Sequence, residues 1–246
     1  MVNSHRSELE VDSLPPYEYQ PLGLRRGERI RLLRIEPARA RDSAVRCSLS
    51  HHDYVTVPYE TLSYTWGDST QSEKIVCSTG SRMGVTHSLA VTRNCLLAIL
   101  ALRRTDRVRT VWIDAICINQ ADNEDRDYGV THMGEIYASS ERTVVYLGEP
   151  DQHSDFIFES VKQLNDEAMM LPSPSCLMLC ISKQQIHAMS QHWEQFTSRP
   201  WFTRTWVIQE VLLSRQVVFI TAGRSLLRGL HLMRFAYTQG NTRDEL

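Results

Sequence analysis

The chain has 246 residues, of which 42% are hydrophobic and 23% charged, so it can bury the core of one large globular domain. Its 27 Lys and Arg residues against 29 Asp and Glu residues give a formal net charge of −2, which argues against a dedicated nucleic-acid-binding protein. The polar N-terminus lacks a signal-peptide pattern and no apolar run has the roughly 18 residues of a membrane span, so we expect a cytoplasmic protein with reduced cysteines.

The N-terminal part of the chain is predicted to be a tail followed by short strands. Prolines and glycines interrupt every periodic pattern in residues 1–28, which predicts a disordered or extended tail. The remaining residues, 29–246, are assigned to a single domain. Its first part is β-rich, with strands expected within 30–35, 45–57 and 59–66 and a hairpin within 75–85.

The rest of the domain alternates predicted helices with predicted strands of the buried type. Helices are expected at 88–104 with Ser88 as the cap, at 123–139, within 151–198 with a break at 171–174, at 198–213, and briefly after Ser225. Strands are expected at 110–118, 142–148 and 216–221. This alternation predicts an α/β fold with a parallel or mostly parallel central sheet flanked by helices. In such folds ligands bind beyond the carboxyl ends of the strands.

A first candidate segment is Tyr59–Asp68, with the sequence YETLSYTWGD. Aromatic residues on a strand commonly serve as core or cross-strand pairs, and that interpretation stays open here. On the functional interpretation, the rim of a binding site is formed by Ser63, Tyr64, Trp66, Gly67 and Asp68.

A second candidate segment, VWIDAICINQ at 111–120, places Asp114 inside an apolar run. A buried carboxylate is costly, so Asp114 must be paired, hydrogen-bonded or close to the strand exit. Asn119 and Gln120 follow where the strand is expected to end, on the ligand side. Cys117 could be the nucleophile of a hydrolase, but no known thiol-enzyme pattern surrounds it, which favours a buried structural thiol.

A third candidate segment is Arg199–Val211, with the sequence RPWFTRTWVIQEV. Helical spacing predicts a helix that is apolar nearly all round and therefore buried, with Glu210 one turn after Trp206. A carboxylate in such surroundings needs a partner, for which Arg199 and Arg204 are the candidates. Glu210 is then either a functional carboxylate or one member of a buried ion pair that fixes the helix. We expect Glu210 to share one cleft with the first two segments.

Together, the three segments resemble the heterokaryon incompatibility (HET) domain of filamentous fungi, with the motif-bearing core at 59–211. The matching blocks are LSYTWG at 62–67, WIDAICINQ at 112–120 and RPWFTRTWVIQE at 199–210, in the order that the family shows. Gly129 stands where the family usually has Gln. The resemblance implies a module of non-self recognition that mediates programmed cell death through homotypic self-association or a sensor protein.

A more distant similarity connects the HET domain to the Toll/interleukin-receptor (TIR) fold, a flavodoxin-like parallel sheet. Some TIR domains cleave NAD with a helical Glu in a Trp-x-x-x-Glu pattern, to which Trp206–Glu210 is similar. This implies a second function, NAD glycohydrolysis activated by oligomerisation, in which Glu210 is catalytic, Arg204 and Trp206 join the substrate site, and NAD is a substrate. No bound cofactor or metal is expected.

Overall fold

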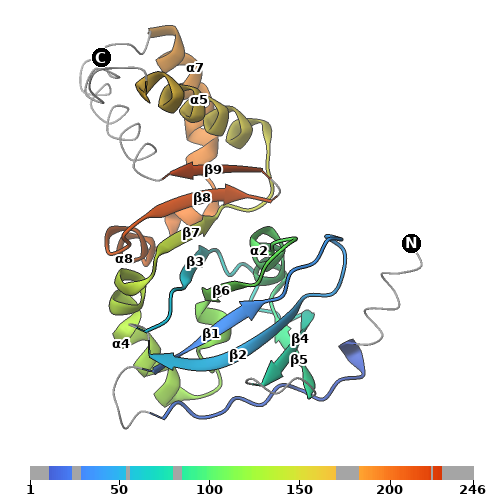
Figure 1. The fold of residues 1–246 in the computed structure, drawn as a ribbon. Coiled ribbons are helices and arrows are strands. Elements are labelled where there is room, and N and C mark those ends of the chain that lie inside the picture. The colour runs from blue at the N-terminus through green and yellow to red at the C-terminus, as the bar shows by residue number, and fades with distance from the viewer. Residues whose placement is uncertain are drawn as a thin grey trace.

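The computed structural model describes residues 11–23, 29–53, 56–79, 85–169, 183–222 and 224–228, whose strands form one nine-stranded sheet (Figure 1). The strands are β1 (Arg29–Ile35), β2 (Arg46–Asp53), β3 (Glu60–Tyr64), β4 (Glu73–Thr79), β5 (Thr86–Val91), β6 (Arg109–Trp112), β7 (Arg142–Tyr146), β8 (Val217–Thr221) and β9 (Arg224–Arg228). Their spatial order is β5-β4-β2-β1-β6-β3-β7-β8-β9.

The sheet combines a parallel part with an antiparallel part. Strands β6, β3, β7 and β8 are mutually parallel neighbours, and β2 also runs parallel to β4. Strand β1 is antiparallel to both its neighbours, as are β4 to β5 and β8 to β9. The mixed α/β class and the extra N-terminal β-rich portion are therefore confirmed, whereas a mostly parallel sheet describes only the part from β6 to β8. Short connections between consecutive strands permit antiparallel pairing, while parallel neighbours need crossovers.

The helices supply those crossovers and cover the sheet (Figure 1). They are α2 (Arg93–Leu102), α3 (Asp114–Cys117), α4 (Asn123–Ser139), α5 (Gln152–Met169), α7 (Lys183–Thr197), the 3-10 helix η3 (Pro200–Thr203) and α8 (Val207–Leu212). Helix α4 matches the predicted range 123–139, and its cap Asp122 accepts hydrogen bonds from the backbone N–H groups of Glu124 and Asp125.

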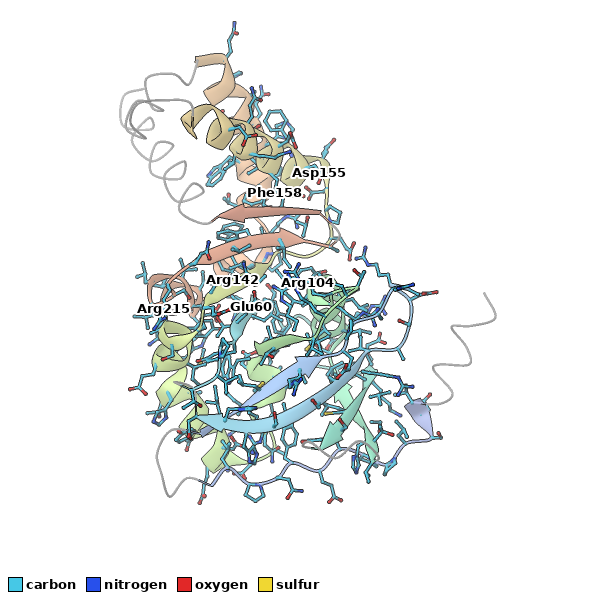
Figure 2. The ribbon with its side chains drawn as sticks, viewed as in Figure 1. Glu60, Arg104, Arg142, Asp155, Phe158 and Arg215 are labelled. Atoms are coloured by element: carbon cyan, nitrogen blue, oxygen red, sulfur yellow. The ribbon has the colours of Figure 1, made fainter. Side chains whose placement is uncertain are left out.

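Both faces of the parallel part are buried, as its continuous apolar sequence predicts. Along β7, Val144 and Tyr146 belong to one core, which extends beneath the N-terminal strands, while Val145 belongs to a second core. The second core contains Phe158 of α5 and Phe196 of α7, so these two helices cover that face (Figure 2). The period-two alternation of strand side chains explains the division.

The amino end of β3 is held by charged side chains. Glu60, which is buried, forms ion pairs with Arg109 of β6 and Arg142 of β7, and Figure 2 shows Glu60 and Arg142 together. A carboxylate with two guanidinium partners on the neighbouring strands fixes their alignment. Candidate ligand groups therefore lie at the opposite, carboxyl end of these strands.

Two predicted elements begin or end elsewhere. The strand predicted at 110–118 ends at Trp112, because the chain turns after Ile113 into α3. The helix predicted from Ser88 begins at Arg93 with Thr92 as its cap, since Ser88 lies in β5 and pairs with Pro15 and Tyr17. Both errors have one origin: apolar spacing marks what is buried but does not say where the backbone changes direction.

Two further predictions near the C-terminus are wrong. The helix predicted at 198–213 is interrupted after η3 at Arg204 and resumes as the short α8, whose cap is Trp206. The segment after Ser225, predicted as helix, lies in β9, which pairs with β8. The predicted loop at 171–174 and the predicted hairpin turn near 81 fall outside the described residues.

The described part of the predicted tail lies against the sheet. After a short helical turn, Pro16 forms a bridge with Ser88, and the chain through residue 23 contains no further helix or strand. The Tyr19 hydroxyl donates to the Ile116 carbonyl at 2.9 Å, and Arg31 donates to the Gln20 carbonyl at 2.8 Å. These contacts attach the segment to the second candidate block and to β1.

Candidate functional site

A cleft of about 540 Å³ lies beyond the carboxyl ends of β3 and β6. It is lined by Thr65, Trp66, Gly67, Asp114, Ile118, Gln120, Arg126, Asp127, Val130, Met133, Arg204 and Trp206. These residues come from all three candidate segments and from α4. The lining is mainly apolar and aromatic with a few polar groups, which is typical of sites for small molecules.

Asp114 joins the first and second segments. Its Oδ2 accepts a hydrogen bond from Trp66 Nε1 at 3.0 Å, and its Oδ1 accepts one from the Ala115 backbone N–H at 2.7 Å. Gln120 donates to the Asp114 backbone carbonyl at 3.0 Å. Asp114 is therefore the first residue of α3 rather than a strand residue, and its side chain remains half-buried in the cleft.

Burial raises the pKa of Asp114 to about 6. The hydrogen bonds from Ala115 and Trp66 act in the opposite direction, the negative charge of Glu210 raises the pKa, and the positive charge of Arg204 lowers it. The charges of Glu210 and Arg204 thus act on the pKa of Asp114 in opposite directions. A carboxyl group that titrates near neutral pH can both accept and release a proton, which general acid–base chemistry requires.

Glu210 joins the first and third segments in a buried network. Its Oε1 accepts a hydrogen bond from Arg204 Nη2 at 2.9 Å, and its Oε2 accepts one from Arg204 Nη1 at 3.2 Å. Oε2 also accepts a hydrogen bond from the Ser63 hydroxyl, which in turn accepts one from Trp201 Nε1 at 2.7 Å. Glu210 is only 1% exposed, so its carboxylate is enclosed by these donors.

Arg204 separates Glu210 from the cleft. Arg204 and Trp206 line the cleft, whereas Glu210 is absent from the lining. Of the two candidate partners of Glu210, Arg204 forms the ion pair, while Arg199 pairs with Asp151 at 2.7 Å. The structure therefore brings Trp66, Asp114 and Arg204 to one surface and places Glu210 directly behind it.

The remaining predicted site residues are divided between the cleft and its surroundings. Gly67 lines the cleft with φ of +69°, a backbone conformation that favours glycine, and an added Cβ would lie 2.4 Å from Asn94 Nδ2 and displace that amide. Gln120 lines the cleft as well. Asp68 is outside it, exposed, and accepts hydrogen bonds from Thr70 in a local turn.

Tyr64 and Asn119 are also outside the cleft lining. Tyr64 is 1% exposed and belongs to the main core beside Cys95, so its ring is not available to a ligand. The Asn119 side chain accepts a hydrogen bond from the Ala121 backbone N–H at 3.2 Å, which stabilises its own turn. Tyr64 thus has the core environment that was the alternative interpretation of its segment, whereas Asn119, which was predicted to face the ligand side, stabilises a turn.

The prediction of a helix that is buried nearly all round is wrong for the third segment. Trp201 is buried, but Trp206, Ile208 and Leu212 of the later part are exposed. Because the chain is not helical at Arg204, η3 and α8 are separate helices with different orientations. Residues that would lie on one face of a continuous helix therefore do not lie on one face here. Glu210 and Val211 are the buried residues of α8.

Two contributors were not predicted from the sequence. Trp201 Nε1 donates a hydrogen bond to the Ser63 hydroxyl. This contact could have been anticipated, because the N–H of a buried indole usually needs an acceptor. Arg31 is buried and pairs with Asp125 at 2.6 Å while also donating to the Cys117 carbonyl at 3.1 Å. An arginine within the apolar strand at 30–35 was the available signal. This ion pair fixes α4 and the second segment behind the cleft.

Cys117 has the environment of a structural thiol. Its side chain is buried, and its sulfur accepts a hydrogen bond from the Ile113 backbone N–H at 3.3 Å. Burial raises the pKa of Cys117 to about 12, so the thiolate is scarce near neutral pH. Within the described ranges, no group of three or more His, Cys, Asp or Glu residues could hold a metal ion.

Comparisons with known proteins concern the segment that builds this cleft. The sequence profile of the family "Heterokaryon incompatibility protein (HET)" matches residues 59–210. Heterokaryon incompatibility protein 6, OR allele, of Neurospora crassa is 29% identical in an alignment of 224 residues, and the match covers 77% of this chain and 32% of that protein. The chain thus spans about a third of the length of this curated relative. No solved structure matches the chain. None of the helices in the described ranges is long and apolar enough to cross a membrane.

Proposed function

Because this chain belongs to the HET family, we propose that it is a module of fungal non-self recognition that mediates heterokaryon incompatibility and programmed cell death. One observation carries the proposal: the three sequence blocks within the matched range build a single unit. Ser63 and Glu210 join the first and third blocks, and Trp66 and Asp114 join the first and second. A shared functional role of the three blocks would explain why they occur together in one sequence and contact one another in the structure.

The proposed partners are further copies of the domain or a sensor protein that clusters it in the cytoplasm. Fusion to a chemically inducible dimerisation domain in a filamentous fungus tests this, with colony viability as the readout. Viability should fall only after the dimeriser is added. Equal killing by a form shown to be monomeric at its cellular concentration would reject the clustering requirement.

The role of the three-block unit is tested by Arg204→Met, which removes the guanidinium that links Glu210 to the cleft. We expect loss of killing in strains whose expression is matched to equal protein abundance, because loss of the ion pair also lowers the stability of the variant. Arg107→Met is the matched control, because Arg107 is an exposed arginine in the loop before β6. Full killing by Arg204→Met would show that cell death does not require the link between the three blocks.

A second candidate function is TIR-like hydrolysis of NAD, activated by oligomerisation. What supports it is the position of the cleft at the carboxyl ends of parallel strands, with two tryptophans and two carboxylates, Asp114 and Asp127, in its lining. Glu210 or Asp114 would stabilise positive charge that develops on the ribose as the nicotinamide bond breaks. The test is NAD consumption by the concentrated, purified chain, before and after induced dimerisation. Stable NAD under both conditions would leave the assembly function as the sole proposal.

A further inference from the structure

The cleft offers a ligand three different kinds of chemistry. Trp66 and Trp206, which are 37% and 50% exposed, present indole surfaces in its lining. Exposed indoles in a concave site favour a planar ligand, because ring faces stack. Arg126 from α4 is exposed at the same cleft and provides a guanidinium group for an anion. The lining also contains two carboxylates, Asp114 and Asp127, which can accept hydrogen bonds, and Asp114 is held beside the Trp66 indole by a hydrogen bond.

Glu210 cannot act as that acceptor in the observed arrangement. Both its oxygens already accept hydrogen bonds from Arg204, and Oε2 accepts a further one from Ser63. Reaching a ligand in the cleft would require Arg204 to leave, which would strand a carboxylate that is 1% exposed. Glu210 therefore acts on the cleft through the position of Arg204.

Asp114 is arranged in the opposite way. Each of its carboxylate oxygens accepts one hydrogen bond, from Trp66 and from Ala115 respectively. A carboxylate has about four acceptor positions, so each oxygen retains capacity for a donor on the ligand. The bond from Trp66 also fixes the indole next to the carboxylate, so that a ring stacked on Trp66 brings its substituents towards Asp114.

We propose that Asp114, rather than Glu210, is the carboxylate that contacts the ligand of this cleft, and that the ligand is a nucleotide. Its base stacks on the indoles, its phosphate is bound by Arg126, and its ribose hydroxyls donate to Asp114. Glu210 is a positioning residue that holds Arg204. This inference rests on the second candidate function for the nature of the ligand, but it concerns binding and requires no turnover.

The test measures the binding of adenosine monophosphate and of its 2′,3′-dideoxy analogue to the purified full chain by calorimetry at pH 7.5. In the wild type, loss of the two hydroxyls should raise Kd about tenfold, as expected when a hydrogen bond to a charged acceptor is lost. Asp114→Asn should raise Kd for adenosine monophosphate similarly and should bind the two ligands almost equally. Glu210→Gln should retain the wild-type ratio between the two ligands.

Glu124→Gln is the control for removal of one negative charge, because Glu124 is an exposed residue of α4 outside the cleft lining. It should bind both ligands as the wild type does. The ratio of two Kd values measured on one sample does not depend on the folded fraction, so a partly unfolded variant remains informative. If Asp114→Asn does not fold at all, Asp127→Asn supplies the comparison, because it removes the other carboxylate of the lining and should retain the wild-type ratio. Loss of the ratio in Asp127→Asn would assign the hydroxyl contact to Asp127 and overturn the proposal.

Three further results would overturn the proposal: a wild type that binds neither ligand at millimolar concentration, a wild type that binds both equally, or a hydroxyl preference that Glu210→Gln abolishes and Asp114→Asn retains. Cell killing is measured separately. Killing without nucleotide binding would reject this inference and leave the proposed cell-death function intact. Nucleotide binding without killing would support this inference and reject the proposed cell-death function.

Discussion

Replacing Glu210 by Gln tests whether the buried ion pair holds the three blocks together. Gln keeps the size of the side chain but removes its charge and turns one acceptor into a donor, which then faces Arg204 or Ser63. Removing one partner of a buried ion pair costs about 3–5 kcal/mol. The Arg204 side chain is 19% exposed and can gain some hydration in the cleft, so we expect about 2–4 kcal/mol. For a domain of this size that is a fall in Tm of roughly 5–15 °C.

The assay is urea-induced unfolding of the wild type, Glu210→Gln, Arg204→Met and the double variant. In the double variant no charge is left without its partner, so its loss of stability should be smaller than the sum of the single losses by about 2 kcal/mol. A change below 1 kcal/mol for Glu210→Gln, or simple additivity in the double variant, would refute the argued role of the pair. Unchanged folding with loss of killing would instead assign the carboxylate to function.

Three other measurements follow from the structure. Native protein should show no reaction of Cys117 with a thiol reagent near pH 7, because the thiol is buried and its pKa is raised to about 12; rapid labelling that abolishes killing would contradict the structural role. Burial raises the pKa of Asp114 from 3.8 to about 6, so the stability linked to this group is complete below about pH 4 and is lost as the pH rises through 6. Asp114→Asn should therefore gain up to about 3 kcal/mol relative to the wild type between pH 4 and 7 in urea titrations, and a constant difference would be inconsistent with this shift. Gly129→Ala should destabilise the protein by about 1–3 kcal/mol, because the new Cβ would lie 2.4 Å from Ile118 Cδ1. The control is Gly134→Ala on the same helix, whose Cβ would lie 3.1 Å from its nearest neighbour and which should be close to neutral. Equal melting temperatures for the two variants would show that Ile118 moves aside freely.

Local sequence patterns determined much of the secondary structure. Helix α4 was predicted at its observed bounds, and the structure shows Asp122 as its cap with two acidic residues in its first turn. Strands β1, β7 and β8 were predicted within one or two residues at each end, because short apolar runs between polar turns leave few alternatives. The three blocks were visible as residues, and their order was sufficient to identify the family.

The tertiary structure decided which of those residues face the cleft. Asp114 and Glu210 are both carboxylates in apolar surroundings by sequence, and nothing in their neighbours distinguishes them. Their environments differ because Arg204, released from a continuous helix by the break after η3, lies between Glu210 and the cleft. Trp201, which precedes that break, donates a hydrogen bond to Ser63, which is 138 residues away in the chain. Periodicity describes a segment on its own, whereas the exposure of a carboxylate depends on contacts between segments that only folding brings together.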